Sequence, residues 1–190
     1  MLYLIGGVAR SGKTRLARML LRRRAIPFMP LDPLVDMVRS AVPDVGVRNW
    51  GRGKAETFAP FLRALVFHLP WTAASYCLEG NAFWPDHVGA IREAASWAPT
   101  AENERGVAVR VVFLGFSDIS LDELRKPPSW LSFTPADRHE TIREELLEES
   151  FLLRDSCQEH GCRYFDVISG EESSLTAPYD FLTADQARPL

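Results

Sequence analysis

One stretch, residues 2–14 with the sequence LYLIGGVARSGKT, constrains this chain more than any other. Its first residues, 2–5, form a short apolar run of the kind that a central parallel strand requires. Residues 7–14 then match the pattern G-x-x-x-x-G-K-[ST] at every fixed position. Residues 14–24 contain good helix formers and few helix breakers. The stretch therefore predicts a buried strand, a glycine-rich turn and the start of a helix.

The residue types of this turn suit a polyphosphate. Glycines let the backbone curl until several N–H groups point into one concavity, and the N-terminus of the following helix adds a positive field. A lysine at position 13 reaches the β- and γ-phosphates, and the hydroxyl of Thr14 is a ligand for Mg²⁺. The pattern indicates phosphate binding but not what happens to the phosphate. The residues that we expect to hold the nucleotide are Gly7, Ala9, Arg10, Ser11, Gly12, Lys13 and Thr14.

The composition sets the broad class of the protein. With 190 residues and 46% hydrophobic content, we expect a single folded domain over residues 1–190. The net charge of −3 argues against a surface that coats nucleic acid, and no apolar run reaches the length of a membrane span. The first predicted strand begins directly after Met1 and leaves no room for a cleavable signal. We therefore expect a cytoplasmic monomer or homodimer with no nucleic-acid or membrane partner.

The three cysteines favour reduced thiols, because their number is odd in a chain that we expect in the cytoplasm. Cys157 and Cys162 are four residues apart, with His160 between them. A structural zinc site there would need a fourth ligand and a more usual spacing. We therefore expect no metal at these cysteines.

Predicted strands and helices alternate along the rest of the chain. Such alternation predicts an α/β fold, a parallel sheet covered by helices on both faces. The second strand contains Pro27 and Pro30, which suit a sheet edge, whereas the apolar run 107–116 suits an internal strand. The further strands are expected at 26–32, 76–80, 107–116 and 163–168, and the helices at 12–24, 33–41, 55–76, 84–97, 121–126, 135–160 and about 177–187.

Three segments are predicted to be irregular. Residues 45–54 contain three glycines and three cations, and form either a solvated loop or a loop that binds an acceptor substrate. Residues 102–106 read as a polar turn. Residues 126–135 contain two adjacent prolines and connect to a long charged helix.

Ligands of parallel sheets bind at the carboxyl ends of the strands. This rule brings residues 7–14, Asp32, Glu79 and residues 116–118 to one edge. Phosphoryl transfer from MgATP needs one carboxylate to position Mg²⁺ and another to accept the proton of the attacking hydroxyl. Asp32 and Glu79 are the candidates, and the sequence does not decide which takes which role. The alternatives are an N-cap for Asp32 and a solvated carboxylate before a turn for Glu79.

Four segments together resemble the P-loop small-molecule kinases: GGVARSGKT, the PLD that ends the second strand, LEGNAFWP and VVFLGFSDIS. This superfamily includes nucleotide kinases, shikimate- and gluconate-kinase-like enzymes and chloramphenicol-type phosphotransferases. The resemblance covers about residues 2–168 and implies a three-layer P-loop NTPase fold, a five-stranded sheet of order 2-3-1-4-5, and the use of ATP and Mg²⁺. It also implies that Asp32 matches the base or acceptor anchor after strand two, and that Glu79 matches the carboxylate that ends strand three.

Two features depart from the nucleotide kinases of this superfamily. Their third strand is followed by a motif whose arginine grips the acceptor phosphate, and the sequence here, residues 79–83 (EGNAF), lacks that arginine. The expected lid, residues 126–143, is also short. The resemblance implies that a lid arginine acts in catalysis with Lys13 and Asp32. Arg138 is our candidate, with Arg125 and Arg143 as alternatives, and an ordinary surface ion pair is the competing interpretation for each.

These observations favour an ATP-dependent kinase that transfers the γ-phosphoryl group of MgATP to a small, hydroxyl-bearing, non-nucleotide acceptor. The alternatives are a nucleoside or nucleotide kinase, and an ATP-binding sensor module without transfer activity.

Overall fold

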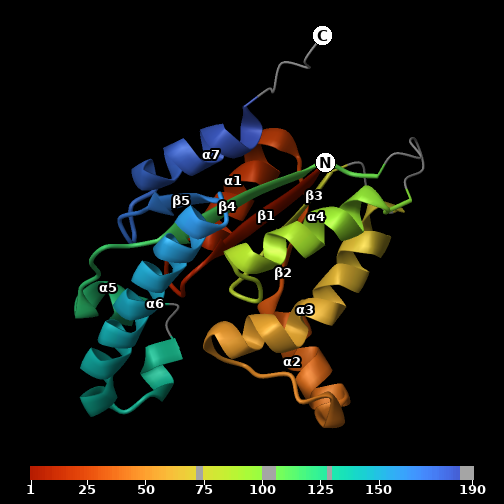
Figure 1. Cartoon of the computed structure of the whole chain (residues 1–190). Coiled ribbons are helices and arrows are strands. Elements are labelled where there is room, and N and C mark those ends of the chain that lie inside the picture. Colours follow the sequence, from red (N-terminus) through yellow and green to blue (C-terminus); the bar gives the residue numbers. More distant parts are fainter. Residues whose placement is uncertain (72–74, 100–105, 128–129, 185–190) are drawn as a thin grey trace.

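The computed structural model describes residues 1–71, 75–99, 106–127 and 130–184. Its centre is one sheet of five parallel strands in the order β2-β3-β1-β4-β5 (Figure 1). This arrangement confirms the predicted fold class and strand order. The strands are β1 (Leu2–Gly7), β2 (Phe28–Pro30), β3 (Tyr76–Glu79), β4 (Val109–Gly115) and β5 (Arg163–Asp166).

Helices cover both faces of the sheet (Figure 1). The α-helices are α1 (Lys13–Arg24), α2 (Asp32–Ala41), α3 (Gly51–His68), α4 (Val88–Ser96), α5 (Leu121–Arg125), α6 (His139–Glu159) and α7 (Thr176–Thr183). Short 3-10 helices lie at Pro43–Val45, Leu69–Trp71, Pro85–His87, Trp130–Phe133, Ala136–Arg138 and Ser173–Leu175. Over the described ranges, no helix is long and apolar enough to cross a membrane.

Alternate residues of β1 serve the two halves of the core. Successive side chains of a strand point to opposite faces, so Leu4 and Ile5 enter different hydrophobic clusters. Leu4 belongs to the cluster that includes buried residues of α3, α4 and α6, and Ile5 to the cluster formed with α1 and α7. Both residues are fully buried, as the apolar run predicted for a parallel strand covered on both sides.

The strands occupy the places that their composition predicted. β2, the strand with prolines, lies at one edge, and β4 is internal between β1 and β5. β1 is the middle strand, paired in parallel with β3 and β4. The carboxyl ends of β1 and β3 are therefore neighbours, which brings the glycine-rich turn beside Glu79.

The start of α3 corrects one prediction. Residues 51–54 belong to the first turn of this helix, whereas the sequence predicted a loop over 45–54. Trp50 is the N-cap, and Lys54 in the first turn is held by side chains from two other segments. These long-range contacts stabilise a helical start that two glycines disfavour locally. The helix also ends earlier than the predicted range of 55–76, because α3 stops at His68 and a 3-10 helix that contains Pro70 follows.

Other boundaries differ by a few residues. Asp32 is not the N-cap of α2 but its first residue; Leu31 is the N-cap, and Asp32 pairs instead with Lys54. The segment expected to be irregular contains a 3-10 helix at Trp130–Phe133, and a second one at Ala136–Arg138 delays the start of α6. Most of the turn predicted at 102–106 lies outside the described residues.

Candidate active site

The glycine-rich turn has the curled backbone that its pattern predicts. Gly7 and Gly12 have positive φ angles of 141° and 89°, and Arg10 has a φ of 69°. A side chain at Gly7 would place a Cβ 2.1 Å from the carbonyl oxygen of Leu114, so only glycine fits there. The turn therefore lies tightly against β4 while it leads into α1.

Two further residues of the turn face inward. Ser11 is buried, and its hydroxyl donates a hydrogen bond to the carbonyl of Val8 at 2.9 Å. Ala9 is half-buried and packs against the larger hydrophobic cluster. These contacts fix the turn from within, as do the backbone hydrogen bonds that Val8 and Ser11 donate to the carbonyls of Leu114 and Val8.

Lys13 begins α1, and its ammonium lies inside the turn. The side chain is buried, and Nζ donates a hydrogen bond to the carbonyl of Val8 at 2.6 Å. Burial lowers the pKa of Lys13, and the nearby carboxylates of Glu79 and Asp32 oppose this shift. An anionic phosphate at the turn would relieve the cost of holding this cation away from water.

Thr14 and Glu79 form a pair of oxygen donors beside Lys13. The Thr14 hydroxyl donates to Oε1 of Glu79 at 2.9 Å, and Glu79 is 4% exposed at the end of β3. Burial raises the pKa of Glu79, and Lys13 and the hydrogen bond from Thr14 oppose this shift. Hydroxyl and carboxylate oxygens are ligands that Mg²⁺ accepts. One hydroxyl and one carboxylate fit Mg²⁺ that is held jointly with phosphates and water.

Asp32 is held by a lysine that the sequence did not single out. Nζ of Lys54 lies 2.9 Å from Oδ1 of Asp32 and 2.7 Å from Oδ1 of Asn81. Lys54 is buried, whereas the side chain of Asp32 is 57% exposed. The ammonium therefore orients a carboxylate that is accessible to a small molecule. The sequence contains one signal, the scarcity of lysine, since the chain has only three. Two of them, Lys13 and Lys54, are buried at this edge in the structure.

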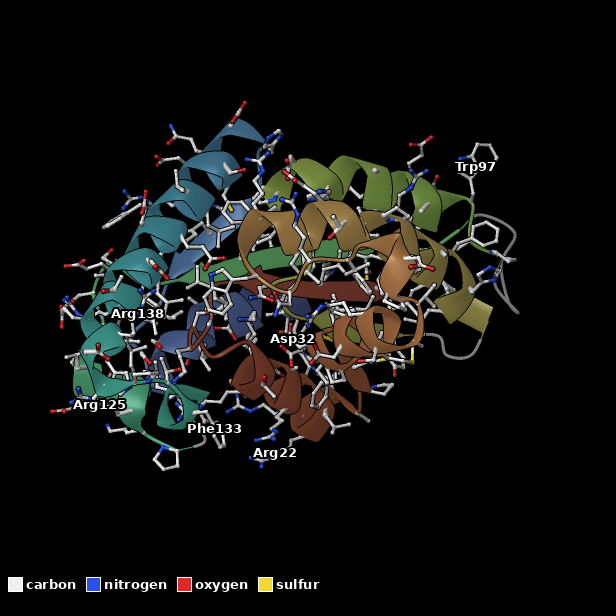
Figure 2. The ribbon with its side chains drawn as sticks, turned by 90° about the horizontal axis from the view of Figure 1, so that it is seen from below. Arg22, Asp32, Trp97, Arg125, Phe133 and Arg138 are labelled. Atoms are coloured by element: carbon white, nitrogen blue, oxygen red, sulfur yellow. The ribbon has the colours of Figure 1, made fainter. Side chains whose placement is uncertain are left out.

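The three candidate lid arginines differ in their contacts. Nε of Arg125 donates to Nδ1 of His139, and Arg143 donates to the carbonyl of Ile119 and pairs with acidic side chains. Arg138 is 58% exposed, 4.0 Å from a carboxylate oxygen of Glu145, and lies apart from Asp32 (Figure 2). The structure therefore places Arg138 at the rim of the site and not beside the other predicted catalytic residues.

A pocket of about 450 Å³ lies on one side of Lys13. It is lined by the glycine-rich turn, the first residues of α1, the end of α5 and residues 168–171 after β5. Nη2 of Arg10 donates to the carbonyls of Glu123 and Lys126, at 2.8 and 3.0 Å, and so ties the turn to the end of α5. The glycine-rich turn and the N-terminus of α1 that line this pocket suit the phosphate chain of a nucleotide.

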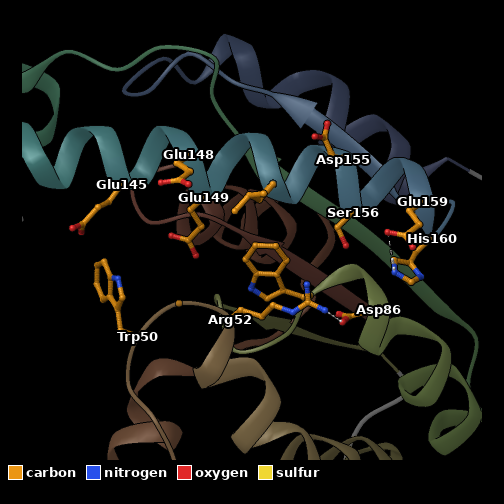
Figure 3. A pocket seen from close by; sticks show the side chains of 13 residues that line it. Trp50, Arg52, Asp86, Glu145, Glu148, Glu149, Asp155, Ser156, Glu159 and His160 are labelled. Atoms are coloured by element: carbon orange, nitrogen blue, oxygen red, sulfur yellow. Dashed lines mark hydrogen bonds and ion pairs between the residues drawn. The ribbon is translucent and has the colours of Figure 1, made fainter.

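A second pocket, of about 750 Å³, lies between the start of α3, the segment after β3, and α6 (Figure 3). Glu149 on α6 lines it, and nothing in the sequence distinguishes this residue from the other acids of a charged helix. Burial raises the pKa of Glu149, and the charges of Lys13 and Lys54 oppose this shift. Lys13 therefore lines the first pocket, and its charge acts on a carboxylate of the second.

The strand order 2-3-1-4-5 with a glycine-rich turn after β1 defines the fold of the P-loop small-molecule kinases. No family model and no curated protein matches the chain. Among solved structures, a shikimate kinase from Bacteroides thetaiotaomicron matches with a TM-score of 0.55 and 16% identity, over 95% of this chain and 94% of that one. A gluconokinase from Sinorhizobium meliloti has a TM-score of 0.52 and 16% identity, over 93% and 90%. A shikimate kinase from Acinetobacter baumannii in complex with shikimate has a TM-score of 0.51 and 16% identity, over 98% and 94%.

Proposed function

We propose that this protein is an ATP-dependent kinase that transfers the γ-phosphoryl group of MgATP to a hydroxyl group of a small acceptor. The observation that carries the proposal is the buried ammonium of Lys13, which lies inside the glycine-rich turn and lines the pocket there, beside Thr14 and Glu79. The pocket with the glycine-rich turn suits the nucleotide, and the pocket beside α6 suits the acceptor. A transfer enzyme needs both substrates to meet at the transferring phosphate.

Each residue of the site takes a role in this reaction. Lys13 and the backbone N–H groups of the turn hold the phosphates, and Thr14 and Glu79 hold Mg²⁺. Bound Mg²⁺ supplies positive charge to the phosphate oxygens. The bond between the γ-phosphorus and its bridging oxygen breaks, and a bond to the acceptor hydroxyl oxygen forms. The hydroxyl proton passes to Asp32, whose carboxylate Lys54 orients.

Two further parts complete the proposal. Arg138 moves inward from the rim when the lid, residues 126–143, closes, and neutralises charge on the transferring group. The kinase names of the similar structures support a phosphoryl transfer, although the likeness itself concerns the fold. A nucleotide acceptor fits less well, because its phosphate would face the carboxylates of the second pocket.

The decisive experiment is a phosphotransfer screen with labelled ATP over alcohols, sugars, amino sugars, nucleosides and nucleotides. We expect label on a non-nucleotide acceptor, and a loss of about 100-fold or more in Lys13→Ala, because one strong electrostatic contact is removed. Arg22→Ala is the matched control, since Arg22 lies at the far end of the same helix (Figure 2). MgADP binding without any transfer would support the sensor alternative, and transfer only to nucleotides would support a nucleotide kinase.

A further inference from the structure

The pocket beside α6 has two unlike walls (Figure 3). The acidic residues Glu145 and Glu149 project from α6 toward the side on which Trp50 and Arg52 lie, and Glu148 lines the pocket from the same helix. Two indole rings and several acidic side chains therefore line the same pocket. The described residues that line it are Trp50, Gly51, Arg52, Trp84, Asp86, Glu145, Glu148, Glu149, Leu152, Asp155, Ser156, Glu159 and His160.

The charges of this pocket do not balance. Of its described lining residues, six are carboxylates and one is a guanidinium, that of Arg52. Arg52 is already engaged: Nη2 lies 2.5 Å from Oδ2 of Asp86, Nε lies 3.4 Å from Glu56, and the guanidinium lies over the ring of Trp84. The charge of Arg52 is therefore balanced by carboxylates on the side of the pocket opposite α6.

Two acids of α6 that line the pocket differ from Glu145, which has Arg138 4.0 Å away. Glu148 and Glu149 form no ion pair with any side chain in the part of the chain that the structure describes. Burial raises the pKa of Glu149 and the charges of Lys13 and Lys54 oppose this shift, but each ammonium donates its hydrogen bonds to other acceptors. Glu148 is exposed and Glu149 is half-buried. Partial removal of the Glu149 carboxylate from water without a close partner costs free energy that a bound cation would recover.

Asp86 on the opposite wall also has unused hydrogen-bonding capacity. Its Oδ1 is buried without a hydrogen-bond donor among the described residues. The nitrogen 3.1 Å away, Nδ1 of His87, already accepts a hydrogen bond from the backbone N–H of Trp84. Oδ1 of Asp86 is closed to solvent and Oδ2 is engaged by Arg52, so the acids of α6 are the carboxylates that a ligand in the pocket can reach.

The arrangement suits an organic cation better than a metal ion. No three of the acidic side chains in the described ranges converge into a metal-binding cluster. From Glu145 to Glu159 the helix rises about 21 Å, so its acids are spread along the pocket. The indole of Trp50 is 47% exposed beside them, and an aromatic face attracts ammonium groups.

We propose that the acceptor is a hydroxyl compound that carries at least one ammonium group, of the amino-sugar type. This inference rests on the proposed kinase function and names the acceptor class of the same site. The ammonium lies against the acids of α6 and the indole of Trp50. Asp32 does not line this pocket, so the hydroxyl extends past the start of α3, where Lys54 holds Asp32. Shikimate and gluconate are carboxylate anions, and an anion in this pocket meets repulsion from Glu148 and Glu149.

The test compares small probes that differ in charge. Calorimetry measures the affinity of the full chain for glucosamine, glucose and gluconate in the presence of a non-hydrolysable MgATP analogue at pH 7. Kanamycin and maltotriose form a second pair, with and without ammonium groups, at larger size. In at least one set the ammonium compound binds about 10-fold or more tightly than its uncharged or anionic partner, and this ratio falls as salt rises. Equal binding within both sets, or tighter binding of gluconate, overturns the proposal.

A charge reversal tests the same wall. Glu148→Lys weakens binding of the ammonium probe by about 10-fold or more and strengthens binding of gluconate. Glu144→Lys is the matched control, because Glu144 is exposed on the same helix and does not line the pocket. Both variants keep the thermal shift with MgADP. If both variants alter probe binding equally, the effect is one of net charge and the proposed pocket is wrong.

Failure of this inference is distinguishable from failure of the kinase proposal. Transfer of label to neutral or anionic acceptors alone overturns the ammonium class and leaves the kinase standing. Charge-selective probe binding without any phosphoryl transfer supports the ammonium site and overturns the kinase.

Discussion

Nζ of Lys54, in the first turn of α3, lies 2.9 Å from Oδ1 of Asp32, the first residue of α2. The same ammonium lies 2.7 Å from Oδ1 of Asn81, just beyond β3. A single buried cation thus joins three segments at the edge of the sheet where the glycine-rich turn lies. Two of its three N–H groups are accounted for by these contacts, and both acceptors belong to the site.

We therefore expect Lys54 to act as a positioning residue for Asp32. Lys54→Met keeps the length and most of the apolar stem but removes the charge, so the Asp32 carboxylate loses its orientation. The turnover number should fall by about 100-fold, while the KM for ATP stays close to that of the wild type. Steady-state kinetics measure both. Arg63→Met, an exposed change on the same helix, is the control; an equal rise in KM and no change in turnover would exclude a positioning role.

Asp32 itself is predicted to take the proton of the acceptor hydroxyl. Asp32→Asn keeps the shape and a hydrogen-bond acceptor for Lys54 but removes the basic carboxylate. Turnover should fall by about 100-fold or more, and the thermal shift with MgADP should be unchanged. Asp36→Asn, one turn later on α2 and exposed, is the matched control. A fully active Asp32→Asn variant would move the base role to Glu79.

The contrast between Lys13 and Lys54 shows how far the sequence leads. Residues 7–14 carry a local pattern whose geometry follows from glycine φ angles and helix polarity, so the strand, the turn and the position of Lys13 were all predictable. The sheet order followed from the resemblance that this pattern supports. Lys54 was assigned to a loop, because its helix starts against local propensity and is stabilised by partners 22 and 27 residues away.

Glu149 was unpredictable for a related reason. α6 contains many acids, and nothing in its periodicity distinguishes an acid that faces solvent from one that faces a pocket. Only the packing of α6 against β4 and β5, through buried residues such as Leu146 and Leu153, sets which face turns inward. The composition of the acceptor pocket is therefore a property of the tertiary structure.

The buried carboxylate of Glu79 predicts a pH dependence. Burial raises its pKa above the unfolded value of 4.5, so the folded protein without ligand retains this proton longer than the unfolded chain does. Its contribution to stability is present below pH 4.5 and is lost as the pH rises through the folded pKa. Mg²⁺ requires the ionised carboxylate, so the stabilisation by MgADP should grow over the same pH interval.

Thermal unfolding with and without MgADP, from pH 4.5 to pH 8, measures this effect. Glu79→Gln should give a smaller MgADP shift with little pH dependence. Glu149→Gln is the control, because the pKa of Glu149 is also raised but the residue holds no metal in the proposed mechanism. If the pH-dependent shift survives in Glu79→Gln and disappears in Glu149→Gln, the titrating group is Glu149 and the prediction for Glu79 is wrong.

The last prediction concerns the link between Arg10 and the lid. Arg10 of the glycine-rich turn donates hydrogen bonds to the carbonyls of Glu123 and Lys126, where the lid segment begins. Beyond it, Nε2 of the buried His139 lies 3.2 and 3.1 Å from the carbonyls of Leu131 and Thr134. The described lid residues therefore form a small folded unit that is attached to the nucleotide turn through one side chain.

Nucleotide binding should therefore reduce the motion of the lid, because a kinase must exclude water while the phosphate is transferred. Hydrogen exchange with a non-hydrolysable ATP analogue and acceptor should show slower exchange in residues 10–14 and also in 121–127 and 130–143. In Arg10→Ala the protection should remain at the turn and be lost in the lid, whereas Arg39→Ala, on the exposed end of α2, should behave as the wild type. Protection confined to residues 10–14 in the wild type would mean that the lid does not close, and would favour a nucleotide-binding module over a kinase.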